Sequence, residues 1–208
     1  MTLAVNSWHS QFMKANGFQF IIFYEGENIV MFYIFLADGF EEIEALCPYD
    51  LILRAGIPVK TVSINETTLV TGTHGIKMHA DITLAEMEED FDGIMLPGGL
   101  PGADNLNACE KVQACLKKAS SEGKLISAIC AAPYVLGQAG LLEGKKATCF
   151  PGFEDRMTGA VHCTDKVVTD ANIITAKGMG AAFEFGIEII KYYKGQAFAE
   201  EIAAKTQN

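Results

Sequence analysis

The chain has 208 residues, half of them hydrophobic, which is enough for one full-sized core and indicates one main domain. Its formal net charge of −10 argues against nucleic acid or an anionic membrane surface as a main partner. No apolar run approaches the length of a transmembrane helix, so we expect no membrane partner. The six cysteines form no C-x-x-C pair, which predicts free thiols in a reducing compartment and therefore a cytoplasmic protein.

Residues 1–30 differ in character from the rest of the chain, and we interpret them as an extension outside the domain. Their apolar stretch, Phe18 to Tyr24, lacks the basic start, the length and the small-residue cleavage site of a secretory signal. The codons for Glu25-Gly26-Glu27 would form a purine-rich run resembling a ribosome-binding site, so we expect Met31 to be the true initiator. The alternative is a real extension that is loosely attached or disordered. We expect the domain to span residues 31–208.

From residue 29 onward, short apolar strands alternate with helices. Residues 29–36 fit a first buried strand, and Asp38-Gly39 makes a turn into a helix that begins at Phe40 and that Gly56 ends. Pro48 should bend this helix or loosen one of its hydrogen bonds. The elements expected next are a strand (57–64), a small hairpin (69–78), an acidic surface stretch (86–90), a third buried strand (93–96) and a helix (110–122).

Residues 124–134 are the stretch around which the chain is organised. An apolar run, 125–129, stops at Cys130 and gives way to small residues and then to a helical pattern through Leu136. This predicts a buried parallel strand, a tight elbow and a helix start. A cysteine at such an elbow adopts a strained backbone geometry, and nearby N–H groups and the positive helix end favour its thiolate. The alternative is a small buried core cysteine.

The remaining pattern completes an α/β fold. After a loop (140–144) we expect short strands at 146–150, 166–169 and 173–176 and helices at 179–193 and 197–204. Alternation of this kind predicts a single-domain, doubly wound, mostly parallel sheet. In such sheets the site lies beyond the carboxyl ends of the strands. Asp38-Gly39, Gly98-Gly99 and Cys130 all fall at that edge, which makes the cysteine a functional candidate.

Three acids crowd the first turn of the first helix. For Glu41 and Glu42, a favourable place at the positive helix end is a sufficient explanation. Glu44 has apolar neighbours, and we expect it to face inward and to hydrogen-bond the sulfur of Cys130. Thiolate and carboxylic acid would then share one proton, with the pKa of Glu44 raised.

Two glycines lie at the same edge of the predicted sheet. Gly98-Gly99 lets backbone N–H groups approach a ligand closely, and together with the N–H of Ala131 they would form an oxyanion hole. A plain glycine turn explains the spacing equally well.

We predict neither a metal nor a cofactor. His74 and His79 are five residues apart and would face opposite sides of an extended strand, and His162 beside Cys163 is an isolated pair. No Walker A sequence occurs, and the residues after Gly98 have the wrong spacing and too many prolines for a dinucleotide loop.

Four motifs give the chain a family resemblance. They are DGFEEIEA (38–45), LPGG (96–99), AICAAP (128–133) and GMGAAFEF (178–185). In this order they resemble the ThiJ/PfpI (DJ-one) family, closest to the branch of the Parkinsonism-associated protein deglycase and bacterial ThiJ-like proteins. The resemblance covers residues 31 to about 205. It implies a flavodoxin-like fold related to class I glutamine amidotransferases, with a nucleophile-elbow cysteine.

The resemblance also assigns roles to individual residues. It implies that Cys130 is the nucleophilic, oxidisable cysteine and that Glu44 is its protonated partner. Gly99 and Ala131 would supply the oxyanion-binding N–H groups. The protein would be a homodimer, with Arg54 near the interface.

The resemblance further implies a pocket rim that includes Gly98, His74, Phe150 and Gly178, and this rim departs from family patterns. His74 replaces a pocket-rim arginine, and Phe150 replaces a histidine of members with good glyoxalase activity. The Gly-Pro-Gly of some relatives is Gly178-Met179-Gly180 here.

Two functions of different classes are compatible with these residues. The first is a cofactor-independent glyoxalase III-type or protein deglycase activity on methylglyoxal, glyoxal or their adducts with thiols and amines, through a cysteine hemithioacetal. The second is a redox sensor or holdase chaperone whose Cys130 is oxidised to a sulfinate. A cysteine peptidase is disfavoured because Ala131 stands where the peptidase-like branch has histidine. An amidotransferase is disfavoured because no histidine follows His162.

Overall fold

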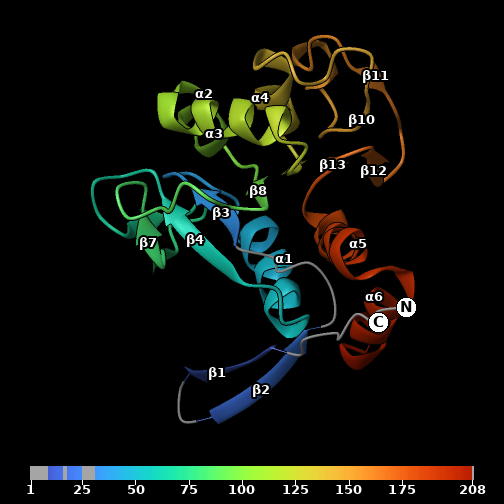
Figure 1. Cartoon of the computed structure of the whole chain (residues 1–208). Helices are drawn as coiled ribbons and strands as arrows, with labels where there is room; N and C mark the ends of the chain where they lie inside the picture. Colours follow the sequence, from blue (N-terminus) through green and yellow to red (C-terminus); the bar gives the residue numbers. More distant parts are fainter. Residues whose placement is uncertain (1–8, 16–17, 25–30, 208) are drawn as a thin grey trace.

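The computed structural model describes residues 9–15, 18–24 and 31–207 (Figure 1). Strands β1 (His9–Ala15) and β2 (Phe18–Tyr24) pair antiparallel and form a two-stranded sheet of their own. The rest of the predicted extension, residues 1–8, 16–17 and 25–30, lies outside the described residues. The proposed initiator Met31 and the domain boundary there remain predictions.

A seven-stranded sheet of order β12-β13-β9-β8-β3-β4-β7 forms the centre of the molecule. Every neighbouring pair is parallel except β12 with β13, which confirms the predicted mostly parallel sheet. Its strands are β3 (Phe32–Leu36), β4 (Val59–Ser63), β7 (Ile82–Thr83), β8 (Gly93–Leu96), β9 (Leu125–Ile129), β12 (Val167–Asp170) and β13 (Ile173–Ala176). Besides β1 with β2, two more small pairs of the described residues lie outside it: β5 (Leu69–Thr71) with β6 (Lys77–His79), and β10 (Lys146–Ala147) with β11 (Val161–His162).

Helices cover both faces of this sheet, as in other doubly wound folds (Figure 1). Strand β3 shows why, because its five residues are all buried and alternate between two cores. Ile34 packs with residues of α1 and α5, whereas Phe35 packs with residues of α2, α3 and α4. The helices are α1 (Glu42–Arg54), α2 (Gly102–Ala108), α3 (Glu110–Ser121), α4 (Pro133–Gln138), α5 (Ala182–Lys194) and α6 (Gln196–Lys205), with 3₁₀ turns at Glu154–Arg156 and Met179–Ala181.

The structure corrects several predicted elements. Helix α2 was not predicted, because its seven residues contain too few apolar positions to show a helical period. The expected strand 146–150 ends at Ala147 and belongs to a separate small sheet. Helix α5 begins at Ala182 rather than 179, since the glycine-containing segment before it forms a 3₁₀ turn. Helix α1 begins two residues later than predicted and runs through Pro48 without interruption.

The sheet order brings the loops of the candidate site together. Strands β9, β8 and β3 are neighbours, and they run in the same direction. The segments that follow them therefore meet at one edge, as predicted. The Glu41 N–H donates to the carbonyl of Gly98 (2.9 Å), so the loop after β3 is bonded directly to the loop after β8.

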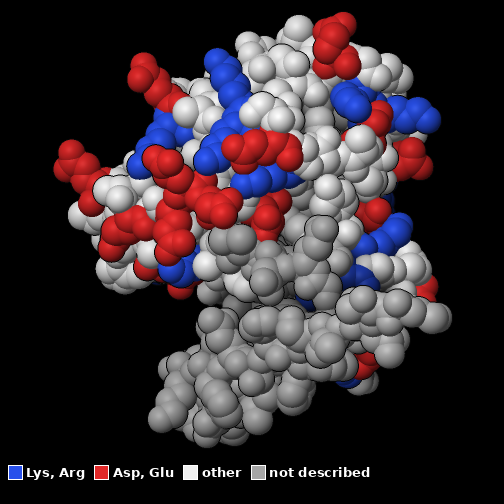
Figure 2. Space-filling model, viewed as in Figure 1, with Lys and Arg blue, Asp and Glu red and all other residues white. Residues whose placement is uncertain are grey.

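The described part of the face shown in Figure 2 carries many acidic side chains, interspersed with lysine and arginine. The stretch 86–90 is largely exposed, as expected. Lys124 bonds Asp90 (3.1 Å) and Glu122 (2.8 Å), so part of this acidity is locally neutralised. Among the helices of the described residues, none is both long and apolar enough to cross a membrane.

Candidate active site

Cys130 occupies the predicted elbow between β9 and α4. Its φ angle is 65°, in the left-handed region that residues with a side chain rarely adopt. Its N–H donates to the Ala176 carbonyl (2.8 Å), and its own carbonyl accepts from the Phe150 N–H (2.8 Å). Both backbone groups are therefore held by other segments, which keeps the cysteine in this unfavourable conformation.

Glu44 faces inward from the first turn of α1, with 1% of its surface exposed. The N–H of Gly98 donates to Glu44 Oε2 (3.0 Å). The carboxyl group is also hydrogen-bonded to the thiol of Cys130 and to the backbone of Met179. The structure thus brings together the two residues that the sequence paired.

Burial raises the pKa of Glu44 from 4.5 to about 7. The negative charge of Glu41 also raises the pKa of Glu44. The hydrogen bond with Cys130 and the backbone hydrogen bonds from Gly98 and Met179 lower it and so limit the rise. The carboxyl therefore retains its proton to a much higher pH than an exposed glutamate.

The pKa of the Cys130 thiol is also raised, to about 12, and burial is the largest cause. The charge and the hydrogen bond of an ionised Glu44 contribute to this rise, while the N–H groups of Ala131 and Gly99 oppose it, so the surroundings of the sulfur favour the thiol, contrary to the thiolate expected from the sequence. The helix dipole invoked from the sequence is weak, because α4 has only six residues. A thiolate at this elbow therefore depends on Glu44 being protonated, since the protonated carboxyl no longer repels the sulfur and can donate to it.

The glycine pair is more than a plain turn. A Cβ on Gly98 would lie 2.6 Å from Cβ of Cys130 and 2.6 Å from Oε2 of Glu44, which no side chain can tolerate. Gly99 has a φ of 85°, and a Cβ there would lie 2.5 Å from the backbone nitrogen of Glu41. Glycine is therefore required at both positions, and it allows the Gly99 N–H to reach the sulfur together with that of Ala131.

Besides Gly98, two more of the expected rim residues lie near this pair. A Cβ on Gly178 would lie 3.2 Å from Phe150 Cδ2 and 3.7 Å from Glu44 Oε1, so the phenyl ring and the carboxyl group both border Gly178. The Phe150 side chain is about half exposed and can be reached from solvent.

His74 has a partner that the sequence did not reveal. Its backbone N–H bonds Glu42 Oε1 (3.0 Å), and its Nδ1 lies 2.7 Å from Glu42 Oε2. Glu42 is only 3% exposed, so a favourable position at the helix end does not fully explain it, contrary to our expectation from the sequence. The carboxylate instead fixes the turn of the β5–β6 hairpin beside the site.

This pair also brings metal-ligating atom types together. Atoms of Glu41, Glu42 and His74 lie within 4.8 Å of one another. Glu42 is already bonded to His74, and Glu41 accepts the Glu44 N–H at the start of α1 (2.7 Å). Both carboxylates therefore have structural roles, and we assign no metal to them.

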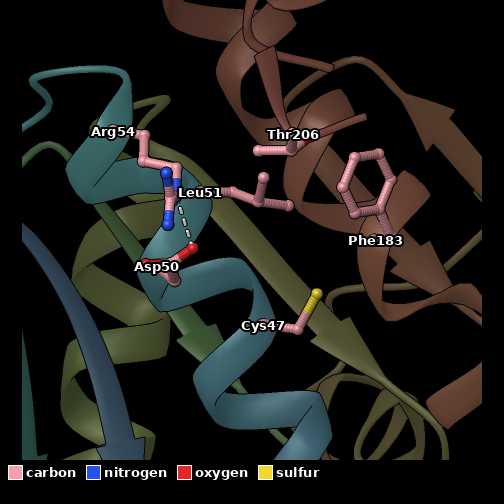
Figure 3. A pocket seen from close by; sticks show the side chains of 6 residues that line it. All are labelled: Cys47, Asp50, Leu51, Arg54, Phe183 and Thr206. Carbon is pink, nitrogen blue, oxygen red and sulfur yellow. Dashed lines mark hydrogen bonds and ion pairs between the residues drawn. The ribbon is translucent and has the colours of Figure 1, made fainter. Parts of the chain in front are cut away.

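Arg54 lies far from Cys130. It ends α1 ten residues after Glu44, about 15 Å along the helix axis. Its guanidinium pairs with Asp50 (2.6 Å) beside a cavity of about 290 Å³ (Figure 3). Cys47 and Phe183 also line this cavity, which is separate from the Cys130–Glu44 pair.

The comparisons with known proteins agree with this geometry. A model of the DJ-1/PfpI family matches residues 30–192. The chain belongs to the DJ-1/PfpI family. It is 38% identical over 171 residues to Protein DJ-1 homolog B of Arabidopsis thaliana. The aligned region covers 81% of this chain and 39% of the plant protein. The chain thus spans less than half the length of that relative.

Other relatives of the family match over nearly their whole length. A Pyrococcus abyssi protein named a deglycase is 36% identical over 165 residues, covering 77% of this chain and 98% of its own. The solved structure of oxidized Toxoplasma gondii DJ-1 superimposes with a TM-score of 0.82 at 35% identity, covering 86% of this chain and 98% of that one. These matches confirm the family and the fold predicted from the four motifs.

Proposed function

We propose that this protein is a cofactor-independent glyoxalase III-type enzyme or deglycase acting on methylglyoxal, glyoxal or their early adducts with thiols and amines. The observation that carries the proposal is the buried carboxyl group of Glu44, hydrogen-bonded to the sulfur of Cys130. A nucleophile beside a group that retains its proton near neutral pH is suited to addition to a carbonyl. The deglycase name of the Pyrococcus abyssi relative supports the same reaction class.

The reaction begins with a carbon–sulfur bond. The Cys130 thiolate adds to the aldehyde carbon, and the carbonyl oxygen takes a proton from Glu44, which gives a hemithioacetal. The N–H groups of Gly99 and Ala131, which lie at the sulfur, stabilise the developing oxyanion.

A proton transfer and a hydrolysis complete the cycle. Glu44, now a carboxylate, removes the proton from the former aldehyde carbon and delivers it to the neighbouring carbonyl carbon. The hemithioacetal hydroxyl passes its own proton to the oxygen on that carbon, so the first oxygen becomes the carbonyl of a thioester and the second the hydroxyl of a 2-hydroxy acid. Water then adds its hydroxyl to the thioester carbon and its proton to the Glu44 carboxylate, the carbon–sulfur bond breaks, and the Cys130 thiolate leaves as lactate from methylglyoxal or glycolate from glyoxal is released. The net change is the addition of one water molecule, and no redox cofactor is consumed.

The experiment that tests this function measures lactate and glycolate release by the wild type and by Cys130→Ser. We expect the variant to lose turnover entirely. Glu44→Gln should lower turnover by roughly two to four orders of magnitude, the usual contribution of acid–base catalysis. A Glu44→Gln protein as active as the wild type would contradict the role of the carboxyl group.

The second candidate is a redox sensor or holdase in which Cys130 becomes a sulfinate. The similarity to a Toxoplasma gondii structure described as oxidized favours it. Two peroxide molecules would each transfer one oxygen atom to the sulfur and leave as water. If peroxide adds two oxygen atoms to Cys130 stoichiometrically while aldehyde turnover is absent, this candidate replaces the first.

We further propose a cytoplasmic homodimer. All six cysteines are free, which supports a reducing compartment. Helix α1 exposes about half of Ile43 and of Leu53, and large apolar side chains on one helix support an interface that includes Arg54 at its end. Sedimentation equilibrium of the wild type and of Leu53→Glu tests this, and a monomeric wild type would refute it.

A further inference from the structure

One side chain, Arg156, joins its own loop to two other segments of the site, although no sequence motif marked it. It lies in the 3₁₀ turn Glu154–Arg156, six residues after Phe150. Its guanidinium carbon is 3.6 Å from the centroid of the Tyr134 ring and 5.2 Å from that of Phe153. Tyr134 is 2% exposed, so the guanidinium rests on a ring that is itself fixed in the core.

Asp104 joins the same cluster from α2. Its Oδ1 accepts from Arg156 Nη2 (3.2 Å) and from the Tyr134 hydroxyl (2.6 Å). The Tyr134 hydroxyl and then Arg156 hold the pKa of Asp104 below its usual value, so the carboxylate stays charged. The cluster is thus a stacked cation with an anion at its edge, an arrangement suited to the planar guanidinium of arginine but not to lysine.

Each member of the cluster belongs to a segment that begins at a group of the site. Asp104 follows Gly99 by five residues, Tyr134 follows Cys130 by four, and Arg156 follows Phe150 by six. The Phe150 N–H is bonded to the carbonyl of Cys130 (2.8 Å), so the beginning of its loop is already fixed at the elbow. Arg156 fixes the other end of that loop.

Close packing leaves little room for the loop to shift without losing this contact. A Cβ on Gly137 of α4 would lie 2.6 Å from the backbone nitrogen of Thr158, so helix and loop touch through their backbones just beyond Arg156. Phe150, at the other end, borders Gly178, which Glu44 also borders.

We propose that Arg156 is a positioning residue that, through Tyr134 and Asp104, holds the Phe150 loop against the elbow and so limits the size of molecules that reach the Cys130 sulfur. This rests on Cys130 being the accessible nucleophile of the proposed function, but not on aldehyde turnover. Arg156 itself contacts no reacting atom.

The test compares alkylation of Cys130 by iodoacetamide and by the bulkier N-benzyl-iodoacetamide, followed by mass spectrometry. The measured quantity is the alkylation rate constant of the bulky reagent divided by that of iodoacetamide. In Arg156→Lys this ratio should rise about fivefold, equivalent to about 1 kcal/mol. In a Phe150→Ala background the same substitution should change the ratio by less than about twofold, because the ring that Arg156 positions is gone. Lys205→Gln, which removes an exposed cation paired with Glu201 on α6 (2.6 Å), is the matched control and should leave the ratio unchanged.

Two results would refute this proposal, and a third would refute the proposed nucleophile on which it rests. A wild-type ratio in Arg156→Lys refutes it, and so does an equal rise in both backgrounds, which would show that Arg156 does not act through Phe150. If Arg156→Lys fails to fold, Asp104→Asn, which keeps the stacking and nearly the same volume, is subjected to the same comparison and the same criteria. If wild-type Cys130 resists both reagents, the nucleophile of the proposed function is wrong, and this result is distinct from an unchanged ratio.

Discussion

Replacing Glu44 by glutamine is expected to flatten the dependence of stability on pH. The pKa of Glu44 is about 7 in the folded protein, against 4.5 for an exposed glutamate, and burial is the largest cause. Between these two pH values the folded protein retains a proton that the unfolded chain has already released. Stability therefore falls as pH rises through this range, and the contribution of the protonated carboxyl is fully present only below pH 4.5.

The size of the effect follows from the same two values. A difference of about 2.5 pKa units corresponds to about 3 kcal/mol of unfolding free energy, lost once the pH has risen above 7. The side chain is almost fully buried, so solvent screening does not reduce this figure much. The nearby His74 and Glu42 also shift each other's pKa values, but this pair is present in both proteins and cancels in the comparison.

The assay is urea unfolding of wild type and Glu44→Gln across this pH range. As the pH rises from 4.5 to above 7, the unfolding free energy of the wild type should fall by about 3 kcal/mol more than that of the variant. Cys130→Ser is the matched control and should keep the wild-type pH dependence, because burial rather than the sulfur raises the pKa of Glu44.

Parallel pH dependences in wild type and Glu44→Gln would refute the reasoning, since they would show that the carboxyl is not the group that retains the proton. The ultraviolet absorbance of the thiolate, followed over the same range, reports whether the sulfur or the carboxyl releases the proton of the pair.

The site and the chain support three further predictions. Gly98→Ala should slow alkylation of Cys130 about tenfold or more, because the added Cβ would lie 2.6 Å from both Cys130 and Glu44; an unchanged rate by mass spectrometry would contradict this. Phe150→His should raise methylglyoxal turnover, measured by steady-state kinetics, because it adds a proton relay at the rim of the site. Turnover equal to or lower than that of the wild type would contradict this. Deletion of residues 1–30 should leave the melting temperature unchanged, because β3 begins at Phe32 and β1 pairs with β2 in a separate sheet; a clear drop would show that the extension stabilises the domain.

Much of the fold could be read from hydrophobic periodicity. The buried strands are continuous apolar runs, and the helices between them repeat with a helical period, so their class and order followed directly. Helix α2 and strand β7 were missed because seven and two residues are too few to show a period. The antiparallel pairing of β12 with β13 follows from the two-residue connection between them, but the place of this pair at the edge of the sheet depends on β13 joining β9, which local sequence does not encode.

The site was predicted in part and for mixed reasons. Small residues after an apolar run identified the elbow at Cys130, because only small side chains fit such a turn. Glu44 was chosen for its apolar neighbours, yet Ile43 is half exposed and Glu42 is buried as well, so that reasoning alone would not have separated the acids. The family motifs supplied the distinction.

Tertiary structure alone decided the remaining features. Glu42 and His74 are 32 residues apart, and Asp104 and Arg156 are 52 apart, and single polar contacts over such distances leave no periodic signal in the chain. The proton balance between Glu44 and Cys130 is decided in the same way. Residue types and spacing predicted that the two would meet, but the pKa of each depends on how completely the segments after β3, β8 and β13 exclude water from them.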